Sequence, residues 1–132
     1  MAMHGLEEIA MKKQSTSRIC LIVSGDPTLR RKLCLMAEQY GFETLEAAGA
    51  TPAQMCIEKH RLVVVVFGEG ENDADTMEAF NRLPSPGNVM RPKTMFIGTS
   101  AAEARERGAD IGLEPSLPVD YESFSRHLRS LE

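Results

Sequence analysis

A run of six apolar residues, Leu62 to Phe67, holds four consecutive valines and constrains the fold more than any other segment. β-Branched side chains favour strands, and a strand without alternating polar residues must be covered on both faces. Ile19 to Val23 is a second run of this kind. Strands buried on both faces are typical of parallel sheets between two layers of helices, so the two runs predict the centre of such a sheet.

Helix signals follow the first apolar run directly. Asp26 is a favourable N-cap, and Pro27 suits the first position of a helix. Apolar residues then recur on one face until Gly41, which is expected to end the helix. The first strand therefore leads into the first helix through a tight turn.

The same alternation continues along the chain. The remaining expected strands are at 42–46, 95–97 and 111–113. The remaining expected helices are one from the N-cap Thr51 and Pro52 to Lys59, one at 75–83, one opened by a capping box from Ser100 to Glu103 and ended at Gly108, and one capped by Asp120. Five strand and helix alternations predict an α/β fold with an open, mostly parallel sheet and helices on both faces. Functional side chains are then expected at the carboxyl ends of the strands.

Length and charge narrow the function classes. The chain has 132 residues, with 15 basic and 19 acidic side chains and a formal net charge of −4. This length suits one domain, expected at 18–132 after a flexible tail at 1–17. The acidic balance argues against a nucleic-acid partner. No apolar run approaches the roughly 20 residues that cross a bilayer, so we expect a cytoplasmic protein without a membrane partner.

The cysteines and histidines suggest no catalytic or metal site. Cys20, Cys34 and Cys56 have no C-x-x-C spacing, so they indicate neither a disulfide framework nor a zinc site, and we expect reduced packing thiols. No pattern brings a histidine together with a nucleophile. We therefore expect no catalytic residue, no bound metal, no cofactor and no enzymatic activity.

Three segments between Arg18 and Leu131 are informative together: Val23-Ser-Gly-Asp-Pro-Thr-Leu-Arg-Arg31, Tyr40-Gly-Phe-Glu-Thr-Leu-Glu-Ala-Ala48 and Arg107-Gly-Ala-Asp110. They resemble the corresponding segments of the CheY-like receiver domains of bacterial response regulators. The resemblance implies a three-layer α/β/α, flavodoxin-like (βα)5 fold, with a five-stranded parallel sheet in the order 2-1-3-4-5. It also implies a role in two-component signalling.

The same resemblance implies that the phosphorylation pocket is degenerate. In the family, an acidic pair after strand one and an Asp ending strand three bind Mg²⁺, that Asp accepts a phosphoryl group, and a hydroxyl and a Lys before proline contact it. The positions in this chain are Ser24 and Gly25 at the acidic pair with Asp26 one place later, Phe67 or Gly68 at the phosphoacceptor, Thr99 or Gly98 at the hydroxyl, and Glu114 with Pro115 at the Lys-Pro pair. Few carboxylates remain for a hard cation, and Glu114 would repel a phosphoryl oxygen.

The expected function is therefore that of a pseudo-receiver, which acts by phosphorylation-independent protein–protein interaction. The resemblance implies a signalling partner, which is a histidine kinase, a phosphotransfer protein or another regulator, or else a second copy of the chain. The candidate partner surface comprises exposed Arg30 and Arg31 on the first helix, and Arg105, Arg107, Tyr121 and Arg126 near the chain's end. Basic residues that are only exposed to solvent and bind no partner would give the same sequence pattern.

Two alternatives stay open. A carboxylate of the 69–75 loop, Glu69 above all, could accept a phosphoryl group, although Glu69, Glu71, Asp73 and Asp75 are otherwise expected to form a solvated acidic loop. A small-ligand site is the other alternative. It would use the amides and hydroxyls of Ser24, Gly25, Thr28 and 98–100 at helix N-termini.

Overall fold

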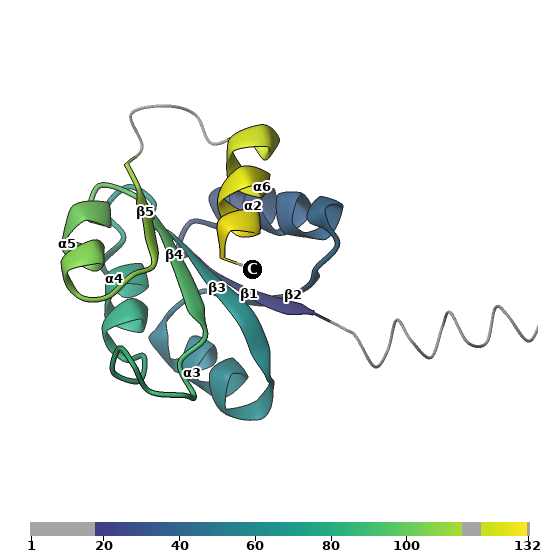
Figure 1. The fold of residues 1–132 in the computed structure, drawn as a ribbon. Coiled ribbons are helices and arrows are strands. Elements are labelled where there is room, and N and C mark those ends of the chain that lie inside the picture. Colours follow the sequence, from purple (N-terminus) through teal and green to yellow (C-terminus); the bar gives the residue numbers. More distant parts are fainter. Residues whose placement is uncertain (1–17, 115–119, 132) are drawn as a thin grey trace, which may run out of the picture.

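The computed structural model describes residues 18–114 and 120–131, which form one sheet with helices on both faces (Figure 1). The elements are β1 (Ile19–Val23), α2 (Pro27–Tyr40), β2 (Glu43–Ala47), α3 (Ala50–Lys59), β3 (Leu62–Gly68), α4 (Ala74–Asn81), β4 (Lys93–Ile97), α5 (Ala101–Glu106), β5 (Ile111–Leu113) and α6 (Tyr121–Ser130). All pairings are parallel, in the order β2-β1-β3-β4-β5. The predicted fold class and strand order are confirmed. The predicted tail at 1–17 lies outside the described residues.

Both faces of the sheet are covered, as the apolar runs predict. Helices α2 and α6 lie on one face, and α3, α4 and α5 lie on the other (Figure 1). Successive side chains of a strand point to opposite faces. Val64 and Val66 of β3 accordingly pack toward α2 and α6, whereas Val65 and Phe67 pack toward α3, α4 and α5. These four side chains are at most 1% exposed, so β3 is the centre of the sheet.

The strand register brings the carboxyl ends of the central strands into one row. Val23 at the end of β1 pairs with Phe67 of β3, and Phe67 pairs with Phe96 of β4. The loops that follow β1, β3 and β4 consequently meet at the same edge of the sheet. This edge is the one at which functional side chains were expected.

Two predicted helix caps are confirmed. Asp26 accepts hydrogen bonds from the backbone N–H groups of Thr28 at 2.9 Å and Leu29 at 3.2 Å, and Pro27 begins α2. Asp120 caps α6 by accepting from the N–H of Ser123 at 2.8 Å. In both cases a carboxylate satisfies amides that have no partner within the helix.

Two other helix starts and one cap differ from the prediction. Helix α3 begins at Ala50 rather than after Thr51, because Pro52 is tolerated anywhere in a first turn, where its missing N–H would have no helical partner. Helix α4 begins at Ala74, one residue early, because Asp73 caps it. The capping box at Ser100 is wrong, since its side chain makes no cap bond. Its hydroxyl instead donates to a carboxylate, Glu69, which is the stronger acceptor.

The expectation of reduced packing thiols is confirmed. All three cysteines are free; Cys20 and Cys34 are buried, and Cys56 is partly buried. Burial raises the pKa of both buried thiols, that of Cys34 to about 11. Neither thiol is therefore an available thiolate near neutral pH. None of the helices in the described ranges is long and apolar enough to cross a bilayer.

Candidate functional site

The predicted pocket lies where the loops after β1, β3 and β4 approach one another, at the carboxyl edge of the sheet. Three glycines allow this approach. A Cβ atom added at Gly25 would lie 2.7 Å from a carboxylate oxygen of Asp73, and one added at Gly70 would lie 2.7 Å from the Cβ of Asp26. A Cβ at Gly98 would collide with the side chain of Glu69. The loops are thus packed on one another through carboxylate side chains.

Phe67 and Gly68, the two expected phosphoacceptor positions, face opposite sides of the sheet. Phe67 is fully buried among aromatic rings, with centroids 5.4 Å from Phe80 and 6.0 Å from Phe96. Gly68 ends β3, and a Cβ atom there would lie 2.6 Å from Cδ1 of Leu33 and 3.1 Å from Cδ2 of Leu29. Side chains of α2 therefore fill the space that a residue larger than glycine would need at position 68.

The residues at the expected acidic pair are engaged in local hydrogen bonds. Ser24 is fully buried, and its hydroxyl accepts from the N–H of Asp26 at 3.1 Å and donates to the Asp26 carbonyl at 3.2 Å. The Asp26 carboxylate is the cap of α2. The N–H of Gly25 donates to Oδ2 of Asp73 at 3.0 Å. The polar side chains of the β1–α2 loop are thus hydrogen-bonded within the chain, and that of Asp26 lies beside Gly70.

Asp73 joins the loop after β1 to the loop after β3. Its Oδ2 accepts from the Thr76 hydroxyl at 2.6 Å and from the N–H groups of Gly25 at 3.0 Å and Gly70 at 3.2 Å. Its Oδ1 accepts from the N–H of Thr76 at 3.1 Å. Burial alone would raise the pKa of this carboxyl, but the hydrogen bonds from Thr76, Gly70 and Gly25 outweigh burial and hold the pKa below its usual value.

Glu69 joins the loop after β3 to the loop after β4 in the same way. Its Oε1 accepts from the Thr99 hydroxyl at 2.9 Å and the Ser100 N–H at 2.8 Å, and its Oε2 accepts from the Ser100 hydroxyl at 2.7 Å. The expectation of a solvated acidic loop is therefore wrong for Glu69 and Asp73. Glu71 is exposed in the loop as expected, whereas Asp75 is exposed in the first turn of α4.

The hydrogen bonds of these loops argue against both alternatives to a pseudo-receiver, namely a small-ligand site and phosphorylation of a loop carboxylate. Amides of Gly25, Thr28 and Ser100, which a small anionic ligand would need, already donate to carboxylates of the chain itself. Within residues 18–114 and 120–131, no group of three or more His, Cys, Asp or Glu side chains is placed to hold a metal ion. Glu114 is exposed after β5, and Pro115 lies outside the described residues.

The predicted partner residues do not form one free basic surface. Arg30 is held to Glu46 at 3.1 Å and donates to the Ser24 carbonyl at 2.8 Å, so the prediction that it is exposed is wrong: its side chain is 20% exposed. Arg107 pairs with Glu103 at 2.7 Å. Arg31 on α2 is exposed as expected, and Arg105, Arg107 and Arg126 are exposed as well, whereas Tyr121 is partly buried against the core.

Asp73 and Glu69 hold the strand-end loops together, although the sequence analysis expected both to be solvated. A cap of the form Asp-x-x-Thr and the glycines after β1, β3 and β4 were the signals that could have identified them. A glycine at a strand end permits another side chain to reach the backbone, but it does not say which one. The sequence could therefore mark the places of close approach without naming the carboxylates.

Comparison with solved structures shows the fold of response-regulator receiver domains. The signal receiver domain of a response regulator from Bermanella marisrubri superposes with a TM-score of 0.73 at 18% identity, over 88% of this chain and 98% of that one. A CheY-like receiver domain from Methylobacillus flagellatus gives a TM-score of 0.70 at 21% identity, over 89% and 100%. The chemotaxis response regulator CheY4 of Vibrio cholerae gives 0.70 at 17%, also over 89% and 100%. No protein-family model and no curated protein sequence matches the chain.

Proposed function

We propose that this chain is a receiver-like module of two-component-type signalling, working in the cytoplasm by phosphorylation-independent protein–protein interaction. It has the receiver fold but none of the receiver's phosphorylation chemistry. The observation that carries the proposal is at the end of β3, where Gly68 stands against Leu29 and Leu33. Glycine has no group to phosphorylate, and two leucines occupy the space that a carboxylate would take.

The surrounding carboxylates support the same conclusion. Three acidic side chains at this edge, those of Asp26, Asp73 and Glu69, each accept hydrogen bonds from backbone amides. A carboxylate that ligates Mg²⁺ would have to give up such charge-assisted bonds. Phosphotransfer through Glu69 would likewise have to break its contacts with Thr99 and Ser100.

The contacts also support a single conformation of the loops. Asp73 joins the β1–α2 loop to the β3–α4 loop, and Glu69 joins the β3–α4 loop to the β4–α5 loop. A ligand shifts a conformational equilibrium only through different affinities for its two states. A module whose loops are already held by its own carboxylates suits constitutive binding.

The face of α2 that points away from the sheet is the preferred partner surface. Leu35 is 51% exposed there, and it lies with Arg31, Lys32 and Thr28 along one shallow hollow of the helix. Exposed basic side chains around an exposed leucine, on a chain of net charge −4, suit a partner with an acidic, partly apolar surface. The partner is a histidine kinase, a phosphotransfer protein, another regulator or a second copy.

The chemical half of the proposal is tested by NMR on the ¹⁵N-labelled full chain. Mg²⁺ is added first and beryllofluoride, a phosphoryl mimic, second, while the amides of Gly25, Gly68, Glu69 and Ser100 are followed. We expect no saturable shift at either step, and a phosphorylatable receiver measured under the same conditions provides the positive control. Saturable shifts at these amides would overturn the proposal and establish phosphotransfer through a loop carboxylate.

The binding half is tested with paired charge variants. Arg31→Glu with Lys32→Glu removes the basic character of α2, and Arg105→Glu with Arg126→Glu makes the same charge change on α5 and α6. We expect the first pair alone to abolish binding to candidate histidine kinases, phosphotransfer proteins and immobilised copies of the chain. Equal losses for both pairs would mean that only net charge matters and would remove α2 as the partner surface.

A further inference from the structure

The outer face of α2 carries a continuous stripe of exposed side chains. Helix α2 lies at the outside of the molecule, on the face of the sheet that it shares with α6 (Figure 1). Its exposed residues between 28 and 40 recur every three or four positions, which is the spacing of side chains on one face of a helix. These residues, the α2 stripe, are Thr28, Arg31, Lys32, Leu35, Glu38 and Gln39.

The charges of the α2 stripe change sign at its centre. Lys32 lies three residues before Leu35, and Glu38 lies three residues after it. Three residues of a helix correspond to about 4.5 Å along the axis. Leu35 is 51% exposed at the midpoint. The α2 stripe thus has opposite charges at equal distances from an apolar centre.

A stripe of this kind is complementary to itself when two copies pack antiparallel. A two-fold axis beside Leu35 places each residue before it opposite the residue that lies equally far after it in the other copy. Lys32 then faces Glu38 of the partner subunit, and the symmetry makes this contact twice. A parallel pair would instead place lysine against lysine and glutamate against glutamate, and like charges repel.

The side chains of Lys32 and Glu38 are available for this contact. Among the residues that the structure describes, neither forms an ion pair, whereas Arg30 on the same helix is held to Glu46 at 3.1 Å. Glu38 accepts one hydrogen bond at Oε2 from the Thr44 hydroxyl, at 3.1 Å. A carboxylate accepts several hydrogen bonds, so Glu38 can pair with a lysine as well.

The shallow hollow of α2 provides space for side chains of the second copy. It has a volume of about 590 Å³, is largely apolar and is lined by residues between Pro27 and Met36. This part of the helix lies on the amino-terminal side of Leu35. In the antiparallel pair it faces Leu35 and Glu38 of the partner subunit, so an apolar side chain enters the hollow and an acid meets Lys32 at its rim.

We propose that two copies of this chain form an antiparallel dimer through the α2 stripe. This inference rests on the proposed function, because it selects the second copy from among the partners considered for the same surface. A contact of one helix with one helix makes a small interface, and small interfaces are typical of transient complexes. Exposed ion pairs are screened by salt. The dimer is therefore weak, and it dissociates further at high ionic strength.

The test is sedimentation equilibrium of the full chain over a range of protein concentrations. We expect the wild type to self-associate, and Lys32→Glu or Glu38→Lys to raise the dimer dissociation constant about tenfold, because each variant converts two attractive pairs into two repulsive ones. An equimolar mixture of the two variants should associate like the wild type. In the mixed dimer the two substituted side chains face each other with opposite charges, and so do the two native ones.

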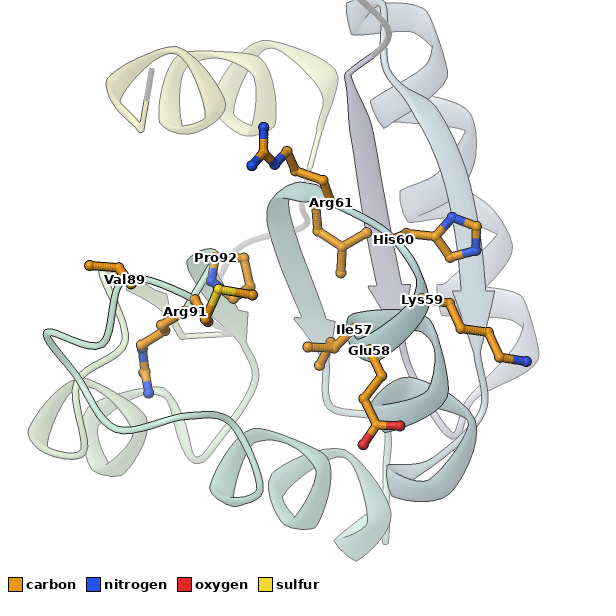
Figure 2. Close-up of a pocket in the computed structure, with 10 residues that line it drawn as sticks. Ile57, Glu58, Lys59, His60, Arg61, Val89, Arg91 and Pro92 are labelled. Carbon is orange, nitrogen blue, oxygen red and sulfur yellow. The ribbon is translucent and has the colours of Figure 1, made fainter.

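Lys59→Glu is the matched control. Lys59 is exposed at the end of α3, on the other face of the sheet, and it points away from the groove between residues 57–62 and 89–92 (Figure 2). This variant changes the net charge as Lys32→Glu does, but it leaves the α2 stripe intact, so it should associate like the wild type. Equal losses for Lys32→Glu and Lys59→Glu would mean that only net charge matters and would overturn the proposal.

The remaining outcomes separate this inference from the proposed function. A wild-type chain that stays monomeric at every concentration would overturn the dimer, as would a mixture that does not recover association. Neither result affects the proposed function, which is judged by the response to beryllofluoride and by binding to other signalling proteins. Saturable shifts with beryllofluoride would overturn the proposed function without changing the sedimentation of the variants.

Discussion

Replacing Asp73 by Ala is the most direct test of how the strand-end loops are held. The change removes the N-cap of α4, which contributes about 1 kcal/mol. It also removes the acceptor for the N–H of Gly25 in the β1–α2 loop and for the N–H of Gly70 in its own loop. Hydrogen bonds to charged groups contribute about 1.5–3 kcal/mol each when buried, but water can replace part of this at a half-exposed site. We expect a total loss of about 2–3 kcal/mol.

Urea denaturation measures this loss as a lower midpoint at an unchanged m-value. Glu71→Ala is the matched control, because Glu71 is an exposed acid of the same loop, and it should change the free energy of unfolding by less than about 0.5 kcal/mol. Equal effects of the two substitutions would refute the view that Asp73 holds the loops together.

The effect of Asp73 should also depend on pH in a defined direction. The folded-state pKa of this carboxyl lies below its unfolded value, so its contribution is complete above the unfolded pKa, near 4, and is lost as the pH falls through the folded pKa. The stability difference between the wild type and Asp73→Ala should therefore shrink as the pH falls below about 4. A difference that stays constant down to acid unfolding would contradict the assigned role of the charged carboxylate.

Three further predictions concern the end of β3, Glu69 and the thiols. Gly68→Ala should lower the free energy of unfolding, measured by urea denaturation, by about 1–3 kcal/mol because the added methyl group meets Leu33. Gly68→Asp should not be phosphorylated by acetyl phosphate. A Gly68→Asp protein that is both stable and phosphorylated would contradict these two predictions. Glu69→Ala should accelerate hydrogen exchange at the Ser100 amide, whereas unchanged exchange would mean that their bond adds no protection. At pH 8 a thiol reagent should modify one cysteine per native chain, Cys56, and all three after denaturation; rapid modification of Cys34 would contradict its raised pKa.

Local patterns were sufficient to predict most of the fold. The valine run of β3 could not be stable as an exposed strand, so it required helices on both faces, and the structure supplies them. Asp26 and Asp120 were recognised as caps because a cap needs only its own side chain and amides two or three residues later. The prediction of Thr51 as the N-cap of α3 was wrong because several first-turn positions accept proline, so Pro52 did not specify a single first residue for the helix.

The candidate site was less predictable, because its contacts join residues far apart in the sequence. Gly25 and Asp73 are 48 residues apart, and Glu69 and Ser100 are 31 apart. The sequence alone could state that a glycine occupies position 68, but not that Leu29 and Leu33 fill the space in front of it. The register of β1, β3 and β4 puts these loops at one edge, and only there do their donors and acceptors meet.

The sequence by itself determined the order of strands and helices, the burial of the central strands and the identity of the residues at each strand end. These properties depend on hydrophobic pattern and on caps, which act over a few residues. The tertiary structure decided which partner each carboxylate has. A carboxylate in an exposed loop prefers water, and Asp73 and Glu69 leave it because parallel pairing presents the amides of Gly25 and Ser100, from neighbouring loops, within hydrogen-bonding distance.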